Sequence, residues 1–491
     1  MENYLLKRSK VIFILVIAVV LLVTAVFFWR QRSTAQAISL DADLQTVIAQ
    51  QGLTPLVAPA PPDPALVALG RALFFDKELS GNRDTSCATC HHPALATGDQ
   101  LPLSIGTGGI GFASQRQLGD NRDFVPRHAT ELFNRGLPEW TTMFWEGRVE
   151  GSATAGFKTD AGDYLPSGLD SALAAQAMFP VTIRTEMRGG WYNVAGYAIQ
   201  PGTVLDEAAA YDQNLPTGWE DTDVFGQPNE LAAIPNDARF FPQIWALLME
   251  RLLAIPAYRE LFRQAYPDVP AAELGFQHAA NAIAAFEAQA FAFTNSPWDR
   301  YLAGDETALT DQAKEGALLF YGRAGCAACH SGPLFTDQQY HNIGAPQFGP
   351  GRDDFAPLDY GRYAITQAPA DKYTFRTPPL HNVALTAPYL HNGAYDSLTA
   401  VIEHHLQTEE ALRAFDGRDL PPELRATLQN YAVTIDDILL TLSPQLPQTE
   451  LSRREIAQLV AFLESLTDPA ATDMNHLFPA TVPSGLPVDD R

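Results

Sequence analysis

Two short stretches of the sequence carry the residues best suited to chemistry, and both read Cys-x-x-Cys-His. The first is CATCH at residues 87–91 and the second is CAACH at residues 326–330. The chain of 491 residues has four cysteines, and all four lie in these two stretches. The residues concerned are Cys87, Cys90, His91, Cys326, Cys329 and His330.

Four kinds of site use cysteines in this arrangement. Four cysteines could form disulfides in an exported protein, and two Cys-x-x-Cys pairs could bind a structural zinc ion or act as thioredoxin-like redox pairs. None of these three sites requires a histidine directly after both cysteine pairs. A c-type haem does, because two thiols bind the porphyrin covalently and the adjacent histidine becomes the proximal ligand of the iron. The sequence therefore predicts two covalently attached haems.

An internal repeat supports this prediction. LGRALFFDKELS precedes the first stretch and EGALLFYGRAGC leads into the second, so that residues 70–75 match residues 316–321 in pattern. The spacing of the apolar residues predicts an amphipathic helix in each copy, which delivers the chain to its haem.

The first forty residues contain an export signal. Residues 11–29 carry no charge and are rich in Val, Ile, Leu and Phe, which predicts one membrane-spanning helix. Basic residues flank it on both sides, with a weak bias toward an N-terminus inside the cell. We expect residues 1–37 to form an uncleaved membrane anchor; the alternative is a signal peptide cleaved after AQA at 35–37. Either segment exports everything after about residue 38.

Composition narrows the class of protein. The formal net charge of −24 argues against nucleic-acid binding and suits a basic protein partner. A hydrophobic content of 46% is typical of a globular protein. We expect a mainly α fold with two cytochrome c-like haem domains and long loops, preceded by a single N-terminal transmembrane helix.

The chain divides into four predicted segments. These are the anchor at 1–37, a proline-rich linker at 38–63, an N-terminal haem domain at 64–300 and a C-terminal haem domain at 301–491. Strong helical patterns run over residues 241–264, 277–293, 309–322, 422–441 and 450–466.

From the first haem to the end, the order of motifs resembles the bacterial di-haem cytochrome c peroxidase family, which includes the MauG-type enzymes. The resemblance covers about 400 residues, with insertions at about 151–171 and 188–237. It rests on ALFFDKELSGNRDTSCATCH (72–91), MFWEGR (143–148), LAAQAMFPVTIRTEM (173–187), the segment 295–332, HNIG (341–344) and TFRTPPLHNVALTAPYLHNGAYDSLTAVIEHH (374–405).

In that family the N-terminal haem is the peroxidatic one and the C-terminal haem relays electrons. The resemblance makes His91 the proximal ligand of the active haem and places Gln176, Pro180 and Glu186 in its distal pocket. A carboxylate there can move a proton between the two oxygens of peroxide, and an amide can orient them. Trp145 matches the tryptophan between the two haems, where it can help electrons to cross; a plain core aromatic is the simpler interpretation.

Many family members are inactive when fully oxidised, because a histidine from a loop caps the active iron. That histidine is expected directly after SIG at 104–106, where this chain has Thr107. We therefore predict an active haem that is five-coordinate at rest and needs no reductive activation. His92 follows the proximal ligand directly and cannot reach the opposite face, so His128 is the remaining alternative cap.

The resemblance makes His330 the proximal ligand of the second haem. The opposite ligand in relatives is a methionine or a tyrosine seven residues after a leucine that matches Leu398, and here that position is His405. His404 is the alternative, and His391 matches a structural histidine near this haem. A bis-imidazole haem has a lower potential than a His/Met haem.

A calcium ion between the domains is common in the family. Thr386 and Pro388 match its two backbone-carbonyl ligands, but the side-chain ligand falls on His128. Imidazole is a poor ligand for this cation, so the resemblance leaves calcium open.

The leading functional hypothesis is a membrane-anchored peroxidase outside the cytoplasmic membrane. It would reduce hydrogen peroxide to water at the first haem, with electrons from a small cytochrome c or cupredoxin entering through the second. The alternatives are a MauG-type enzyme that oxidises side chains of a partner protein, and a plain electron-transfer cytochrome.

Overall fold

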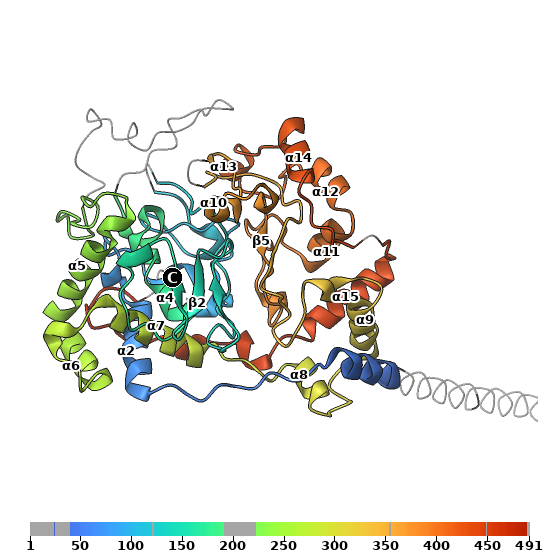
Figure 1. Cartoon of the computed structure of the whole chain (residues 1–491), viewed down its shortest axis with the longest axis horizontal. Helices are drawn as coiled ribbons and strands as arrows, with labels where there is room; N and C mark the ends of the chain where they lie inside the picture. The colour runs from blue at the N-terminus through green and yellow to red at the C-terminus, as the bar shows by residue number, and fades with distance from the viewer. Residues whose placement is uncertain are drawn as a thin grey trace, which may run out of the picture.

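The computed structural model describes Thr24 and residues 40–119, 122–190, 222–352, 355–447 and 449–488. It is mainly helical, with two large hydrophobic cores side by side (Figure 1). The predicted anchor at 1–37 lies, apart from Thr24, outside the described residues. Among the described residues, no helix combines the length and the apolar character needed to cross a membrane.

The first core is built around a helix pair. Helix α2 (Pro64–Phe75) begins where the first haem domain was predicted to start, because Asp63 caps it by accepting a hydrogen bond from the Ala65 amide at 2.7 Å. It crosses α7 (Phe276–Ala290) at Gly70, where a Cβ atom would lie only 1.8 Å from the carbonyl oxygen of Ala282. Glycine is therefore the one residue that permits this approach.

The second core repeats the same construction. Helix α9 (Asp311–Tyr321) crosses α15 (Arg453–Glu464) at Gly316, where a Cβ atom would lie 1.9 Å from the carbonyl oxygen of Gln458. One turn further on, Phe320 packs on Phe462 with ring centroids 5.1 Å apart. The repeat found in the sequence thus corresponds to α2 and α9, the first helix of each pair, which precedes the Cys-x-x-Cys-His stretch of its domain.

The other helices cover these two pairs and connect them. In the first domain they are α3 (Cys87–Cys90), α4 (Ala172–Ala177), α5 (Phe241–Ala254) and α6 (Pro256–Ala265); in the second they are α8 (Pro297–Leu302), α10 (Tyr363–Thr366), α11 (Leu398–Leu406), α12 (Thr408–Ala414), α13 (Pro422–Arg425) and α14 (Ala432–Leu439). Two predicted helices are each divided in two. Proline explains the break at Pro256, which cannot continue a helix but can begin the next one.

Strands are few and short among the described residues. β1 (Thr142–Met143), β2 (Val149–Ser152) and β3 (Gly156–Lys158) form an antiparallel sheet in that order, and the predicted insertion at 151–171 supplies β3. β4 (Tyr340–His341) pairs with β5 (Phe375–Arg376). The turn between β1 and β2 holds Trp145.

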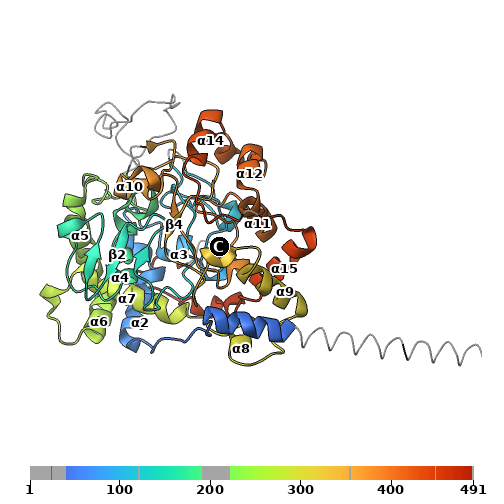
Figure 2. The same cartoon turned by 45° about the vertical axis from the view of Figure 1, so that its right-hand side comes forward.

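The two ends of the described chain cross over between the domains. Residues 40–51 form a helix whose Leu44 is buried in the second core, and this helix lies beside α8 and α9 (Figures 1 and 2). Its Asp41 accepts a hydrogen bond from the Tyr301 hydroxyl at 2.8 Å and pairs with Lys314 at 2.5 Å. The structure thus places a packed helix within the predicted linker 38–63.

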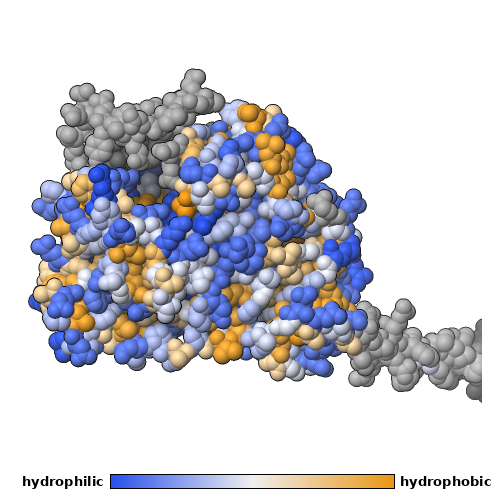
Figure 3. Space-filling view, in the orientation of Figure 1, coloured by the Kyte–Doolittle hydropathy of each residue, from blue (hydrophilic) through white to orange (hydrophobic). Residues whose placement is uncertain are grey.

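The C-terminal tail packs in the opposite direction. Met474 and Val482 are buried in the first core, and Arg71 of α2 donates to the carbonyl oxygens of Leu477 and Phe478, both at 2.9 Å. The predicted C-terminal domain 301–491 therefore ends in a segment that belongs to the first domain. The face seen in Figure 3 is mixed, with hydrophilic and apolar residues interspersed, and Val433 of α14 and the adjacent Leu440 are exposed.

Candidate active site

A cavity with about 1100 Å³ of empty space opens in the first domain, next to α3. The predicted residues that line it are Cys87, Cys90, His91, Trp145, Gln176, Pro180 and Glu186. They come from α3, from the turn after β1, from α4, and from the two turns Pro180–Thr182 and Arg184–Arg188 that follow it. The structure therefore brings every residue predicted for the active haem to one cavity.

The histidines after the two cysteine pairs are held in the same way. Nδ1 of His91 lies 3.2 Å from the carbonyl oxygen of Thr97, and Nδ1 of His330 lies 3.0 Å from that of Phe335. A hydrogen bond from Nδ1 to a carbonyl leaves Nε2 as the electron-pair donor. Burial lowers the pKa of both imidazoles to about 4, which keeps them neutral. Both rings are thus prepared to bind a metal.

The four thiols also suit covalent attachment. In the structure the cysteines are free, so the disulfide alternative receives no support. Cys87 and Cys90 line the first cavity and Cys326 and Cys329 line the second, which separates the two pairs that a shared zinc site would need. Two thiols, one imidazole and largely apolar walls in each cavity fit one c-type haem.

Glu186 is the carboxylate of the predicted distal pocket. It lies in the short π-helical turn Arg184–Arg188 and faces the first cavity. Burial raises its pKa above the ordinary value, although Arg148 and Arg352 act in the opposite direction. A carboxyl group in this environment can both accept and return a proton.

Three arginines and two carboxylates form a buried charge cluster at the same cavity. Arg127 donates to both oxygens of Asp359, at 2.6 and 2.7 Å. The fully buried Glu146 pairs with Arg127 and Arg148, and lies 3.4 Å from Arg352. Burial acts to raise the pKa of Glu146, but the three guanidinium groups outweigh it and hold that pKa below its usual range. Arg148 also lies 3.5 Å from Asp160, so the cluster is a network of paired charges, and its guanidinium groups suit the carboxylates of a haem.

This charge cluster was not predicted from the sequence. Glu146 and Arg148 stand in MFWEGR, where only Trp145 was singled out. Two opposite charges directly after a tryptophan were the available signal. Arg127 and Arg352 lie far from them in the sequence, so only the fold shows that they belong together.

Trp145 lines both cavities. Its indole N–H donates to the carbonyl oxygen of His128 at 2.9 Å, and its own carbonyl oxygen accepts from the Arg376 amide at 2.7 Å. His391 lies 6.4 Å from it between ring centroids and stacks on Phe375 at 3.5 Å. An aromatic bridge therefore spans the wall between the two cavities.

The second cavity has about 1320 Å³ of empty space and is lined by Cys326, Cys329, His330 and His405. Nδ1 of His405 lies 2.7 Å from the carbonyl oxygen of Val401, so that Nε2 is left for the cavity. The neighbouring His404 points elsewhere: its Nδ1 lies 2.9 Å from the Tyr395 hydroxyl and its Nε2 lies 2.7 Å from the Ile343 carbonyl oxygen. Of the adjacent pair, His405 is the one placed to bind a second haem.

Thr107, His92 and His128, the residues considered for capping the iron of the first haem, lie in three different environments. Thr107 is buried and bonded to Asp84, and it is not part of the first cavity's wall. His92 packs between Phe112 and Phe478, with ring centroids 4.6 and 4.9 Å away. His128 does line the first cavity, with Nδ1 2.8 Å from the Leu101 carbonyl oxygen.

The predicted calcium ligands are the backbone carbonyl oxygens of Thr386 and Pro388, and the side-chain contacts of these residues do not decide whether calcium binds. Thr386 donates its hydroxyl proton to the Val383 carbonyl oxygen at 3.1 Å, and Pro388 follows a cis peptide bond. Among the described residues, one side-chain cluster has the spacing of a metal site, namely Cys329, Asp337 and His341. Cys329 belongs to the second haem stretch, so this cluster does not bear on calcium. Calcium at Thr386 and Pro388 stays a prediction.

Comparison with known proteins decides the family. The model of the di-haem cytochrome c peroxidases matches residues 64–307. The methylamine utilization protein MauG of Methylorubrum extorquens is 30% identical over 419 residues, which cover 85% of this chain and 82% of that protein. The chain belongs to the di-haem cytochrome c peroxidase family. It is an oxidoreductase of the cytochrome-c peroxidase type.

Other relatives agree with this assignment. Cytochrome c551 peroxidase of Pseudomonas aeruginosa is 30% identical over 325 residues, which cover 66% of this chain and 67% of that protein. A solved MauG-like protein associated with microbial copper homeostasis aligns with a TM-score of 0.53 and 24% identity, over 86% of this chain and 95% of its own. The di-haem peroxidase BthA of Burkholderia thailandensis aligns with the same TM-score and 21% identity, over 85% of this chain and 92% of its own. These two structures share the fold.

Proposed function

We propose that this chain reduces hydrogen peroxide to water at its first haem, with electrons that enter through its second haem. One observation carries the proposal: Glu186 and Gln176 line the same cavity as His91, and Trp145 lines both this cavity and the next. When bound, the haems supply the iron that takes up peroxide and the redox equivalents that reduce it.

The side chains around the first cavity supply proton transfer and orientation. Glu186 takes the proton from one oxygen of peroxide and returns it to the other, so that the leaving oxygen departs as water. Gln176 holds the peroxide by its amide without titrating, and Pro180 closes the wall beside it. The guanidinium groups of Arg127, Arg148 and Arg352 line the cavity and stabilise negative charge that develops there.

The second site serves electron entry. His330 and His405 are the residues that would hold the second haem iron, and a pair of imidazoles would favour a low potential. From there the aromatic bridge of His391, Phe375 and Trp145 leads toward the first cavity. A small cytochrome c or a cupredoxin is the proposed donor, and the acidic net charge of −24 favours a basic one.

The first haem is proposed to be open at rest. Where relatives with a capped iron are expected to carry a histidine, this chain has Thr107, whose hydroxyl is bonded inside the protein at 3.0 Å from Asp84. The chain therefore reacts with peroxide without prior reduction. The sequence also supports an uncleaved anchor at 1–37 that holds the two haem domains outside the cytoplasmic membrane.

A MauG-type activity is the second candidate. The similarity to MauG over 85% of this chain favours it, and so does a second haem site whose wall, among the described residues, includes no methionine. In that case the oxidising power generated with peroxide would pass through Trp145 to side chains of a partner protein. A plain electron-transfer cytochrome is disfavoured, because it has no use for Glu186 and Gln176 at an open cavity.

The test is to mix the oxidised, haem-loaded full chain with peroxide by stopped flow, and then to supply a reduced small cytochrome. Rapid reaction followed by catalytic oxidation of the cytochrome supports the peroxidase. Rapid reaction with no oxidation of the cytochrome, but with cross-links in a co-purified protein, supports the MauG-type enzyme. No reaction with peroxide contradicts both.

A further inference from the structure

The loop 104–109 lies directly against the backbone of the distal carboxylate. The Thr107 amide donates to the carbonyl oxygen of Glu186 at 3.0 Å. At Gly106 a Cβ atom would lie 2.3 Å from that oxygen and 2.8 Å from the Glu186 Cα. The loop thus fits against Glu186 so closely that no side chain has room at position 106.

Asp84 holds the other side of the same loop. Its carboxylate accepts from the Thr107 hydroxyl, at 3.0 and 3.1 Å, and from the Gly108 amide at 2.6 Å. Arg116 adds hydrogen bonds to the carbonyl oxygens of Ile105 at 2.8 Å and Gly106 at 2.9 Å. A loop whose amides, carbonyls and hydroxyl are bonded in this way is fixed rather than free to swing.

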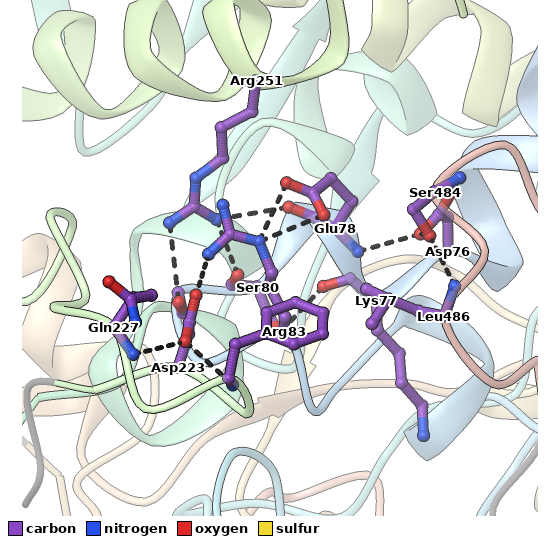
Figure 4. A network of polar contacts seen from close by, with 12 residues as sticks. Asp76, Lys77, Glu78, Ser80, Arg83, Asp223, Gln227, Arg251, Ser484 and Leu486 are labelled. Carbon is purple, nitrogen blue, oxygen red and sulfur yellow. Dashed lines mark hydrogen bonds and ion pairs between the residues drawn. The ribbon is translucent and has the colours of Figure 1, made fainter. Parts of the chain in front are cut away.

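The turn 80–84 supports Glu186 from a second direction. The Gly81 amide donates to the Met187 carbonyl oxygen at 2.8 Å. Arg251 donates to the Ser80 carbonyl oxygen at 2.9 Å, and Arg83 pairs with Glu78 and Asp223 (Figure 4). Figure 4 shows Arg251 extending from α5 to this turn, with its guanidinium group beside that of Arg83, which is part of the turn. The turn that ends in Asp84 is therefore a firm base for the loop.

We propose that Thr107 and Gly106 are positioning residues for Glu186. They touch its backbone rather than peroxide or haem, and they fix the place of its carboxyl group in the first cavity. This inference rests on the proposed role of Glu186 in proton transfer. It assigns a new task to the loop position where a capping histidine was expected. Because catalytic groups must be held to within about 0.5 Å, small displacements of this backbone reduce proton transfer.

Four variants of the full, haem-loaded chain test the proposal. Thr107→Val removes the hydroxyl bonded to Asp84 while keeping the shape of the side chain, and Thr107→Ser retains that hydroxyl. Gly106→Ala pushes on the Glu186 backbone. Thr427→Val is the matched control, because it removes a hydroxyl with two hydrogen bonds in the second domain, to the Leu424 carbonyl oxygen and from the Gly349 amide, both at 2.7 Å.

The first readout is the affinity of the ferric first haem for fluoride, measured against pH without peroxide. Fluoride binds such an iron together with a proton, so its affinity reports where a distal carboxyl group holds that proton. The second readout is the rate of reaction with peroxide. Haem content, the melting temperature and the spectrum of the second haem show whether each variant has folded.

We expect Thr107→Val and Gly106→Ala to weaken fluoride binding and slow the peroxide reaction by about tenfold to a hundredfold. Thr107→Ser and Thr427→Val should match the wild type. Equal fluoride affinities in all four variants and the wild type would overturn the proposal, even if the peroxide reaction proceeds. A wild type that reacts with peroxide no faster than Glu186→Gln would instead overturn the proposed function.

Discussion

Replacing Glu186 by glutamine isolates the proton transfer at the first haem. The substitution keeps the size of the side chain and leaves Gln176, Pro180 and the arginine cluster in place, so binding and orientation of peroxide are retained. The loss is therefore that of a general acid–base group alone, about 10²- to 10⁴-fold in the rate of reaction with peroxide. This equals about 2.7–5.4 kcal/mol of activation free energy at 1.36 kcal/mol for each factor of ten.

The pH dependence gives a second signature of the same group. As proton acceptor Glu186 must be ionised, and burial raises its pKa above the ordinary 4.5. The wild-type rate should therefore fall as the pH drops through this raised pKa, and Glu186→Gln should lack that limb. Stopped-flow mixing with peroxide from pH 4 to pH 8 measures both effects.

Glu287→Gln is the matched control for this experiment. Glu287 is a buried carboxylate of α7 that lines the same cavity, and one of its oxygens has no hydrogen-bond partner. Glu287 has no proposed part in proton transfer, so Glu287→Gln should keep the wild-type rate and pH profile. If Glu186→Gln stays within about threefold of the wild type, or if Glu287→Gln loses as much, the assignment of Glu186 is refuted.

Three further predictions concern the bridge, the second haem and the charge cluster. Trp145→Phe should slow the oxidation of the reduced second haem after peroxide is added, seen by rapid-scan absorption, while the initial peroxide reaction stays unchanged. His405→Met should raise the potential of the second haem in a redox titration, whereas His404→Gln should leave its ligands in place. Glu146→Gln should destabilise the protein by about 3–5 kcal/mol at neutral pH, because it breaks buried ion pairs. Since the pKa of Glu146 is depressed in the fold, this difference in stability should shrink as the pH falls from the ordinary pKa of glutamate toward that lower value.

Local patterns in the sequence predicted most of the fold. The helices of the pairs α2/α7 and α9/α15 carry amphipathic periodicity, and a glycine lies in α2 and in α9 before each cysteine stretch, so these helices could be predicted. The packing of each end of the chain against the other domain could not be predicted. Leu44 lies in the second core and Met474 lies in the first, and nothing local in a short apolar segment tells which distant surface it covers.

Some residues of the candidate site could also be predicted from the sequence, and others could not. The cysteine stretches and the residues around Glu186 could be found from motifs with fixed spacing. In the structure they line the two cavities. The choice between His404 and His405 needed the helix geometry of α11, since adjacent residues point in different directions. The charge cluster needed the fold itself, because Arg127, Glu146 and Arg352 are brought together by long loops.

The electron paramagnetic resonance spectrum of the fully oxidised, haem-loaded protein tests the central claim most directly. An open first haem and a second haem bound by His330 and His405 predict one high-spin ferric signal and one low-spin signal of bis-imidazole type. Two low-spin signals would contradict the account, because a protein ligand such as His128 would then occupy the position that peroxide must take.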